Sequence, residues 1–120
     1  MKKKIAILGS TGSIGENTLK ILKKDKKNFE INLLSTNTNI NKIFKQAKEF
    51  KVKNIIISDL ISYKKAKIKF KGSKINIYDN FNHLNKIIKT KNDLVMSSIT
   101  GLNGLLPTLK SIRYTKNILI

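Results

Sequence analysis

The sequence predicts an α/β fold, a doubly wound parallel sheet of about six strands with helices on both faces. Short apolar runs alternate along the chain with longer segments whose apolar residues recur at helical spacing. The first apolar run, Ile5–Leu8, leads into a glycine-rich turn and then into a helical pattern. Because strands that alternate with helices are joined by right-handed crossovers, this order calls for a parallel sheet.

Each expected element follows from its own run of residues. Strands are expected at residues 5–8, 31–34, 55–57, 75–77, 94–96 and 118–120. Helices are expected where apolar residues share one face, namely at Ile14, Leu19, Ile21 and Leu22; at Ile40, Ile43, Phe44, Ala47 and Phe50; at Phe81, Leu84, Ile87 and Ile88; and at Leu105, Leu106, Leu109 and Ile112. The lysine-rich segment 58–73 is expected to hold a short helix that ends near Gly72.

Length and composition indicate one domain without cysteine chemistry. The chain has 120 residues and no cysteine, so neither disulfides nor thiolates are available. No apolar run reaches membrane-spanning length, and the run after Lys2–Lys4 is too short for a signal peptide. We therefore expect a cytoplasmic protein with no membrane partner. Because the sequence stops on the apolar run 118–120, where a carboxylate is costly to bury, we expect residues 1–120 to be the N-terminal part of a longer enzyme.

The strong positive charge has two interpretations. The formal charge is +18, but among the 25 basic residues only Arg113 is an arginine, and the lysines are scattered along the chain. Nucleic-acid sites favour arginine and a clustered basic patch, so a solvated lysine surface and no nucleic-acid partner are expected. A basic module that binds nucleotides or nucleic acid remains the alternative from another class.

The glycine-rich turn predicts a dinucleotide site of the Rossmann type. Its spacing is Gly-x-x-Gly-x-x-Gly, from Gly9 to Gly15. The first glycine permits a tight turn, Gly12 lets the backbone approach phosphate oxygens, and Gly15 lets the helix pack against the strand. The N-terminus of that helix would then face the pyrophosphate. Further hydroxyl donors come from Ser10, Thr11 and Ser13.

The end of the second strand bears on the choice of dinucleotide. NAD-selective sites carry an acidic residue there, whereas this chain reads Ser-Thr-Asn-Thr-Asn over residues 35–39. With no carboxylate to repel a 2′-phosphate, and with Lys42 one turn further on, NADP(H) is the expected cofactor. The same residues could simply turn the chain and cap the next helix, and the two interpretations are compatible.

The sequence offers no catalytic or metal-binding constellation. Its few acidic residues show no metal-ligand spacing, and His83, the one histidine, is expected at the surface. After the fifth strand, Ser97, Ser98 and Thr100 either line the nicotinamide side or make a turn into Gly101.

Three segments together support a family resemblance. They are Gly-Ser-Thr-Gly-Ser-Ile-Gly at 9–15, Val-Met-Ser-Ser-Ile-Thr-Gly at 95–101 and Gly-Leu-Leu-Pro-Thr-Leu at 104–109. In this order, over the whole chain, the sequence resembles the 1-deoxy-D-xylulose 5-phosphate reductoisomerases of non-mevalonate isoprenoid biosynthesis. An aspartate-semialdehyde dehydrogenase, which has a similar turn, is the alternative among enzymes.

The resemblance implies an oxidoreductase and isomerase that uses NADPH and a divalent cation, Mg or Mn, to convert its sugar phosphate to 2-C-methyl-D-erythritol 4-phosphate. It places the pyrophosphate at Thr11, Gly12, Ser13 and Ile14, and the ribose with its 2′-phosphate at Asn37, Thr38 and Asn39. Many members carry lysine where this chain has Thr38. The metal ligands and sugar-phosphate groups lie beyond the resembled segment. The 120 residues are therefore expected to bind cofactor without turnover, and the full-length enzyme to be a homodimer.

Overall fold

The computed structural model describes residues 2–88, 92, 94–98, 118 and 119. Their strands form one parallel six-stranded sheet in the order β4-β3-β2-β1-β5-β6. The strands are β1 Lys3–Leu8, β2 Phe29–Thr36, β3 Asn54–Ile57, β4 Asn76–Tyr78, β5 Leu94–Ser97 and β6 Ile118–Leu119. The predicted parallel sheet is confirmed, with several strands longer than their apolar runs.

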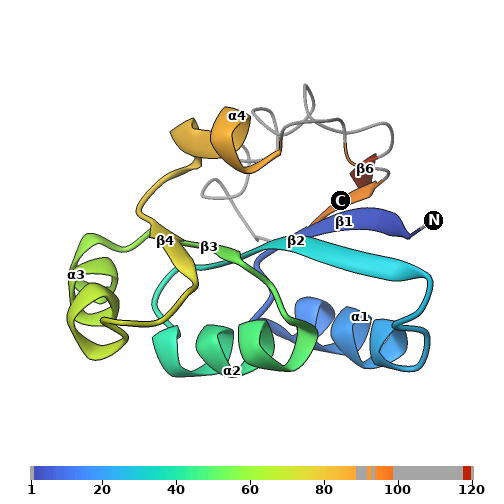
Figure 1. Ribbon diagram of the computed structural model, residues 1–120, viewed down its shortest axis with the longest axis horizontal. Helices are drawn as coiled ribbons and strands as arrows, with labels where there is room; N and C mark the ends of the chain where they lie inside the picture. The colour runs from blue at the N-terminus through green and yellow to red at the C-terminus, as the bar shows by residue number, and fades with distance from the viewer. Residues whose placement is uncertain (1, 89–91, 93, 99–117, 120) are drawn as a thin grey trace.

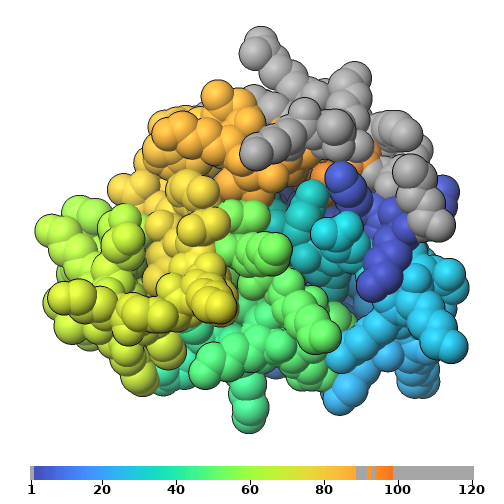
Figure 2. All heavy atoms as spheres, in the orientation of Figure 1, coloured from blue at the N-terminus to red at the C-terminus, as the bar shows by residue number. Residues whose placement is uncertain are grey.

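Helices cover both faces of the sheet, as predicted (Figure 1). One face packs against α1 Ser13–Lys23, α2 Ile40–Phe50 and α3 Leu60–Lys69. The other face packs against the 3-10 turn η1 Phe81–His83 and the short helix α4 Leu84–Ile87. In the space-filling view, α3 lies beside the segment that leads into β4 (Figure 2). The helix expected at 105–112 lies outside the described residues, as does Thr100.

The alternation of β1 shows how one strand serves two cores. Ile5 and Ile7 belong to the cluster under α1 to α3, whereas Ala6 and Leu8 belong to the cluster under η1 and α4. Successive side chains of a strand point to opposite faces, so a strand covered on both sides reads as a continuous apolar run. This is why Ile5–Leu8 shows no polar alternation.

Helix α1 contacts the core through part of the predicted face, since Leu19 and Leu22 are buried as expected. Its buried residues are Gly15, Leu19 and Leu22, which are spaced four and three residues apart. Ile14 and Ile21 are instead 59% and 69% exposed. The prediction that these two isoleucines mark the core face was wrong, because the glycine packs closest to the sheet and so fixes the rotation of the helix.

Local side-chain bonds fix where α2 and α3 begin. The Asn39 side chain accepts a hydrogen bond from the Lys42 backbone N–H at 3.3 Å, and Asp59 accepts one from Ser62 at 3.0 Å. Such caps satisfy donors that have no partner within the helix. The Ser62 hydroxyl also donates to Asp59 at 2.8 Å, and this bond together with the one from the Ser62 backbone lowers the pKa of the Asp59 carboxyl below its ordinary value. The short helix expected in segment 58–73 is confirmed as α3, and Gly72 follows its end with a positive φ of 90°.

The sheet reverses its winding at β1. From β1 the chain proceeds outward through β2, β3 and β4, and then crosses back to place β5 on the other side of β1. In open α/β sheets, ligands bind beyond the carboxyl ends of the strands at such a switch point. The ends of β1 and β5, at Leu8 and Ser97, therefore locate the candidate site.

Candidate dinucleotide-binding site

The turn after β1 needs glycine at two positions for structural reasons. Gly9 has a φ of 78°, a conformation that residues with a side chain rarely adopt. A Cβ atom on Gly15 would lie 2.5 Å from the Gly9 carbonyl oxygen and 2.6 Å from the Ser10 Cα atom. Gly15 is therefore required for the close packing of α1 against the end of β1, as its place in the motif predicts.

Gly12 has no such structural reason to be glycine. It is the N-cap of α1, with an ordinary φ of −80°, and a Cβ atom there would make only a van der Waals contact of 3.7 Å. It is exposed, and no side chain caps the helix in its place. The first N–H groups of α1, which have no partner within the helix, thus open onto a surface without side-chain cover at that point. This arrangement suits an anion that approaches the backbone.

Ser10 holds the turn in place and does not point outward as the sequence suggested. Its side chain is fully buried, and its hydroxyl donates to Gln46 Oε1 at 2.8 Å. Gln46 Nε2 donates back to the Ser10 carbonyl at 2.9 Å, and the Ser10 N–H donates to the Ser35 carbonyl at 2.9 Å. Sequence reasoning missed Gln46, because a polar residue on a helix ordinarily faces solvent.

Thr11 and Lys42 join the turn to the end of β2 and to α2. The Thr11 hydroxyl lies 2.7 Å from that of the buried Thr36, and the Lys42 ammonium donates to the Thr11 carbonyl at 3.3 Å. The same ammonium forms an ion pair with the Glu16 carboxylate. Its hydrogen bond holds the pKa of Glu16 below the ordinary carboxyl value. A cation and an anion thus meet beside the glycine turn.

The three candidate residues after β2 are all exposed, and their backbone and amide groups also shape the loop. Asn37 Oδ1 accepts a hydrogen bond from the Ser58 hydroxyl at 3.0 Å. The Thr38 carbonyl accepts one from the Ile40 N–H at 2.9 Å, and Asn39 caps α2 as described above. The structure therefore gives this cluster the turning and capping role while leaving it open to solvent beside Thr11.

Ser98 fastens the end of β5 to the glycine turn. Its hydroxyl lies within hydrogen-bond distance of the Leu8 carbonyl, at 2.9 Å, and of the Gly9 carbonyl, at 2.8 Å. Its backbone N–H also donates to the Leu8 carbonyl at 2.9 Å. Of the two interpretations of this segment, these bonds favour a structural turn for Ser98, while Ser97 is buried.

The rest of the described chain offers less chemistry. Within residues 2–88, 92, 94–98, 118 and 119, no three acidic, histidine or cysteine residues form a group that could hold a metal ion, and no helix is long and apolar enough to cross a membrane. His83 is half-buried, and its ring lies 5.3 Å from that of Tyr78.

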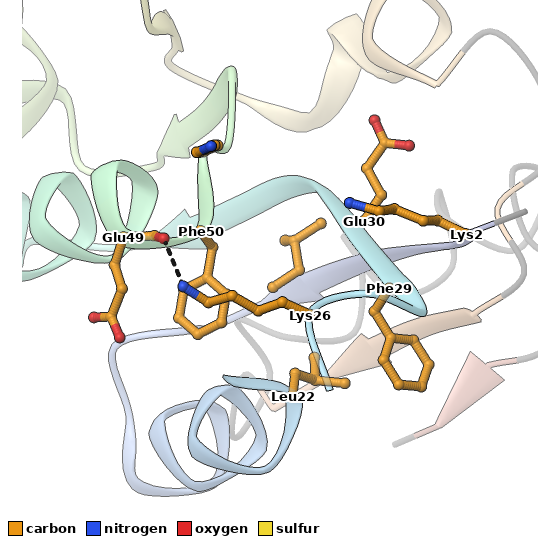
Figure 3. A pocket seen from close by; sticks show the side chains of 9 residues that line it. Lys2, Leu22, Lys26, Phe29, Glu30, Glu49 and Phe50 are labelled. Carbon is orange, nitrogen blue, oxygen red and sulfur yellow. Dashed lines mark hydrogen bonds between the residues drawn. The ribbon is translucent and has the colours of Figure 1, made fainter. Parts of the chain in front are cut away.

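A cavity of about 470 Å³ lies at the opposite edge of the sheet, where the strands begin (Figure 3). Lys26 crosses it, with its ammonium 3.1 Å from the Glu49 carbonyl and 5.0 Å from the centre of the Phe50 ring. The Lys26 ammonium is thus bonded within the protein, and the cavity lies at the end of the sheet away from the carboxyl ends of the strands. For these two reasons we do not assign the dinucleotide to this cavity.

Several known proteins that are similar to this chain share one description. The model of the family described as 1-deoxy-D-xylulose 5-phosphate reductoisomerase matches residues 5–120. The reductoisomerase of Pelagibacter ubique (strain HTCC1062) is 50% identical over 120 residues, which cover 98% of this chain and 31% of the relative. That of Caldanaerobacter subterraneus subsp. tengcongensis is 36% identical over 97% of this chain and 30% of the relative. The chain therefore spans about a third of the length of these curated relatives.

Solved structures agree with the sequence comparisons. The reductoisomerase from Zymomonas mobilis in complex with NADPH matches with a TM-score of 0.83 and 27% identity, over 98% of this chain and 32% of that chain. A reductoisomerase in complex with NADPH, fosmidomycin and magnesium matches with a TM-score of 0.83 and 30% identity, over 98% of this chain and 29% of that chain. This chain thus belongs to the 1-deoxy-D-xylulose 5-phosphate reductoisomerase family.

Proposed function

We propose that the chain is the NADPH-binding domain of a reductoisomerase that converts 1-deoxy-D-xylulose 5-phosphate to 2-C-methyl-D-erythritol 4-phosphate. The observation that carries this proposal is the exposed Gly12 at the N-terminus of α1, located at the switch point of the sheet. Family membership and the NADPH in the Zymomonas mobilis structure support it. Bound NADPH would supply the hydride for the reduction.

The pyrophosphate would lie against the turn formed by Thr11, Gly12, Ser13 and Ile14. In this position it would receive hydrogen bonds from the first N–H groups of α1 and benefit from the positive end of the helix dipole. Ser13 and Ile14 are exposed, and Gly12 presents no side chain, so the protein's own atoms leave that approach open.

The adenosine ribose and its 2′-phosphate would lie beside Asn37, Thr38 and Asn39. These residues follow β2, where sites that select NAD carry a carboxylate on the ribose 2′-hydroxyl. Here the exposed groups are amides and a hydroxyl, which donate hydrogen bonds to phosphate oxygens without repelling them. NADPH is therefore the expected cofactor.

The rest of the proposed activity belongs to the part of the family's length that this chain does not span. The described residues contain no group that could hold a metal ion. As the family resemblance implies, the divalent cation, Mg or Mn, and the sugar phosphate would be bound outside this domain, and the complete enzyme would be a cytoplasmic homodimer. The chain by itself should bind NADPH and show no turnover.

A calorimetric titration of the purified chain with NADPH and, separately, NADH at low and moderate salt tests the proposal. One-to-one binding that favours NADPH and survives moderate salt supports it. Weak binding of both dinucleotides that disappears as salt rises would instead identify a basic surface that attracts any polyanion. The aspartate-semialdehyde dehydrogenase alternative is set aside by the family match over residues 5–120.

The variant Gly12→Val makes the test specific for the turn. A branched side chain there would occupy the space that the pyrophosphate needs, while the 3.7 Å contact leaves room for it in the free protein. We expect NADPH affinity to fall by about tenfold to a hundredfold, as for the loss of a hydrogen bond to a charged group, while the variant remains folded. Asn17→Val, on the exposed side of the same helix, is the matched control and should keep its affinity. Unchanged binding by Gly12→Val would show that the turn is not the site.

A further inference from the structure

Lys42 differs from every other lysine that the structure describes. The other described lysines are exposed, whereas Lys42 is half-buried and its side chain is 39% exposed. It begins in the first turn of α2 and extends across to α1, where its ammonium contacts the Thr11 carbonyl and the Glu16 carboxylate. This lysine is therefore fixed beside the glycine turn, not spread into solvent.

Two other charged groups lie near Lys42: its partner Glu16, and Lys69, whose ammonium donates to Asn41 Oδ1 at 2.6 Å. The turn and the loop after β2 themselves present uncharged side chains. The turn presents Thr11 and Ser13, and the loop after β2 presents amides and a hydroxyl at 37–39. Among the described residues, Lys42 is the cation with a recorded bond to the turn. A short neutral side chain stands at position 38, so any charge recognition of a 2′-phosphate must come from another residue.

The expected path of the dinucleotide passes close to this ammonium. With the pyrophosphate at the N-terminus of α1, the ribose crosses from the turn toward the end of β2. Thr11 and Thr36 mark that crossing, since their hydroxyls are 2.7 Å apart, and Lys42 contacts Thr11. In NADP sites a cation near the end of the second strand accommodates the 2′-phosphate.

Glu16 gives this lysine a competing partner. The carboxylate lies in the first turn of α1, and the Lys42 hydrogen bond holds its pKa below the ordinary value, so it stays ionised at neutral pH. A 2′-phosphate carries up to two negative charges near neutral pH. It would therefore compete with Glu16 for the same ammonium and be repelled by the carboxylate.

Resting on the proposed function, we infer that Lys42 and Glu16 together set the preference of this site for a 2′-phosphorylated dinucleotide. Lys42 binds the 2′-phosphate, and Glu16 weakens that binding by competing for the ammonium. Lys42 thereby takes the place of the lysine that many relatives carry at position 38. Without a ligand, the charge of Lys42 is partly neutralised by Glu16.

The test compares dissociation constants for NADPH and NADH in four proteins: the unmodified chain, Lys42→Met, Glu16→Gln and the double variant. The readout is the ratio of the NADH constant to the NADPH constant, which cancels effects on the shared part of the two molecules. We expect Lys42→Met to lower the ratio about tenfold to a hundredfold, as for the loss of a charge-assisted hydrogen bond. Glu16→Gln should raise the ratio severalfold, and the double variant should resemble Lys42→Met.

Lys45→Met is the matched control, since Lys45 is exposed on the same helix and its loss changes the net charge equally. It should leave the ratio unchanged, and thermal melts should show that all variants fold. If the unmodified chain prefers NADPH and Lys42→Met keeps the same preference, the inference is wrong while the proposed function still holds. A ratio that Glu16→Gln leaves unchanged or lowers would overturn the role of Glu16. An unmodified chain that binds neither dinucleotide would overturn the proposed function itself.

Discussion

The two edges of the sheet are both rich in polar side chains, yet they use them differently. At the edge where the strands begin, asparagine amides bond to one another: Asn32 and Asn92 exchange hydrogen bonds of 2.7 and 2.9 Å, and Asn76 donates to Asn54 at 3.1 Å. At the edge where the strands end, the Ser10 hydroxyl donates to Gln46 Oε1 and the Ser98 hydroxyl bonds to backbone carbonyls, and both brace the glycine turn. The asparagines of the first edge bond to one another, whereas the bonds of the second edge support a surface that faces outward.

This difference separates structural polar groups from groups available to a ligand. Amides that bond to one another contribute to stability and have less bonding capacity left for a partner. The braced turn keeps the hydroxyls of Ser10 and Thr11 occupied but leaves the helix N-terminus and the exposed residues after β2 in contact with solvent. The number of polar side chains alone therefore does not locate a site. What locates it is which polar groups are bonded within the protein and which remain in contact with solvent.

The largest expected effect separates two glycines of the same turn. Gly15→Ala places a methyl group within 2.5 Å of backbone, which forces the helix away from the strand. We expect it to lower the free energy of unfolding by about 3 kcal/mol, the upper end of the usual cost of overpacking, because the atoms it meets are backbone. Gly12→Ala should cost less than about 1 kcal/mol, the usual cost at an N-cap. Chemical denaturation of both variants measures this, and equal losses would contradict the separate roles assigned to the two glycines.

An intermediate effect is expected at the opposite edge. Asn92 is fully buried, and Asn92→Ala leaves the Asn32 amide without its partner, at a cost of about 1–3 kcal/mol of unfolding free energy. NADPH affinity should not change, because the pair lies at the other end of the strands. The double variant Asn32→Ala, Asn92→Ala should lose less than the sum of the single losses. If Asn92→Ala lowered NADPH affinity without lowering stability, the structural role assigned to the asparagines at this edge would be wrong.

The smallest expected effect is the loss of stability at acidic pH from two surface ion pairs, and it should be similar at the two edges. Lys42 pairs with Glu16 near the turn, and Lys23 pairs with Glu49 at 2.9 Å toward the other edge; both carboxyls have a pKa below the ordinary 4.5. Each pair therefore stabilises the fold above that pH and loses its contribution as the pH falls through and below it. The loss should be slight, since all four side chains lie at the surface and are more than a third exposed.

Thermal midpoints of the Glu16→Gln and Glu49→Gln variants between neutral and acidic pH test this. Each variant should show a slightly flatter acid limb than the unmodified chain, and by a similar amount. A much larger change for one of them would show that its ion pair is more than a surface contact.

Much of the fold and of the site could be read from local patterns. The glycine turn, the strands at 5–8 and 55–57 and the helix at 40–50 were predictable, because each rests on a run of neighbouring residues with one periodicity. The placement of Ile14 and Ile21 was not, since the rotation of α1 depends on how closely Gly15 approaches the Gly9 carbonyl. Ser10 was also misjudged, because its partner Gln46 is distant in sequence and reaches it only in the folded chain.

The sequence by itself determined the order of strands and helices, the glycine turn and the absence of a carboxylate after the second strand, since these are local or compositional properties. Only the tertiary structure decided which polar groups are free. The register of β1 against β2 skips Asn32, which turns that side chain toward Asn92, and the packing of α2 beside α1 brings Lys42 to Thr11 and Glu16. These contacts join residues 26 or more positions apart in the chain, so no periodicity along the sequence could specify them.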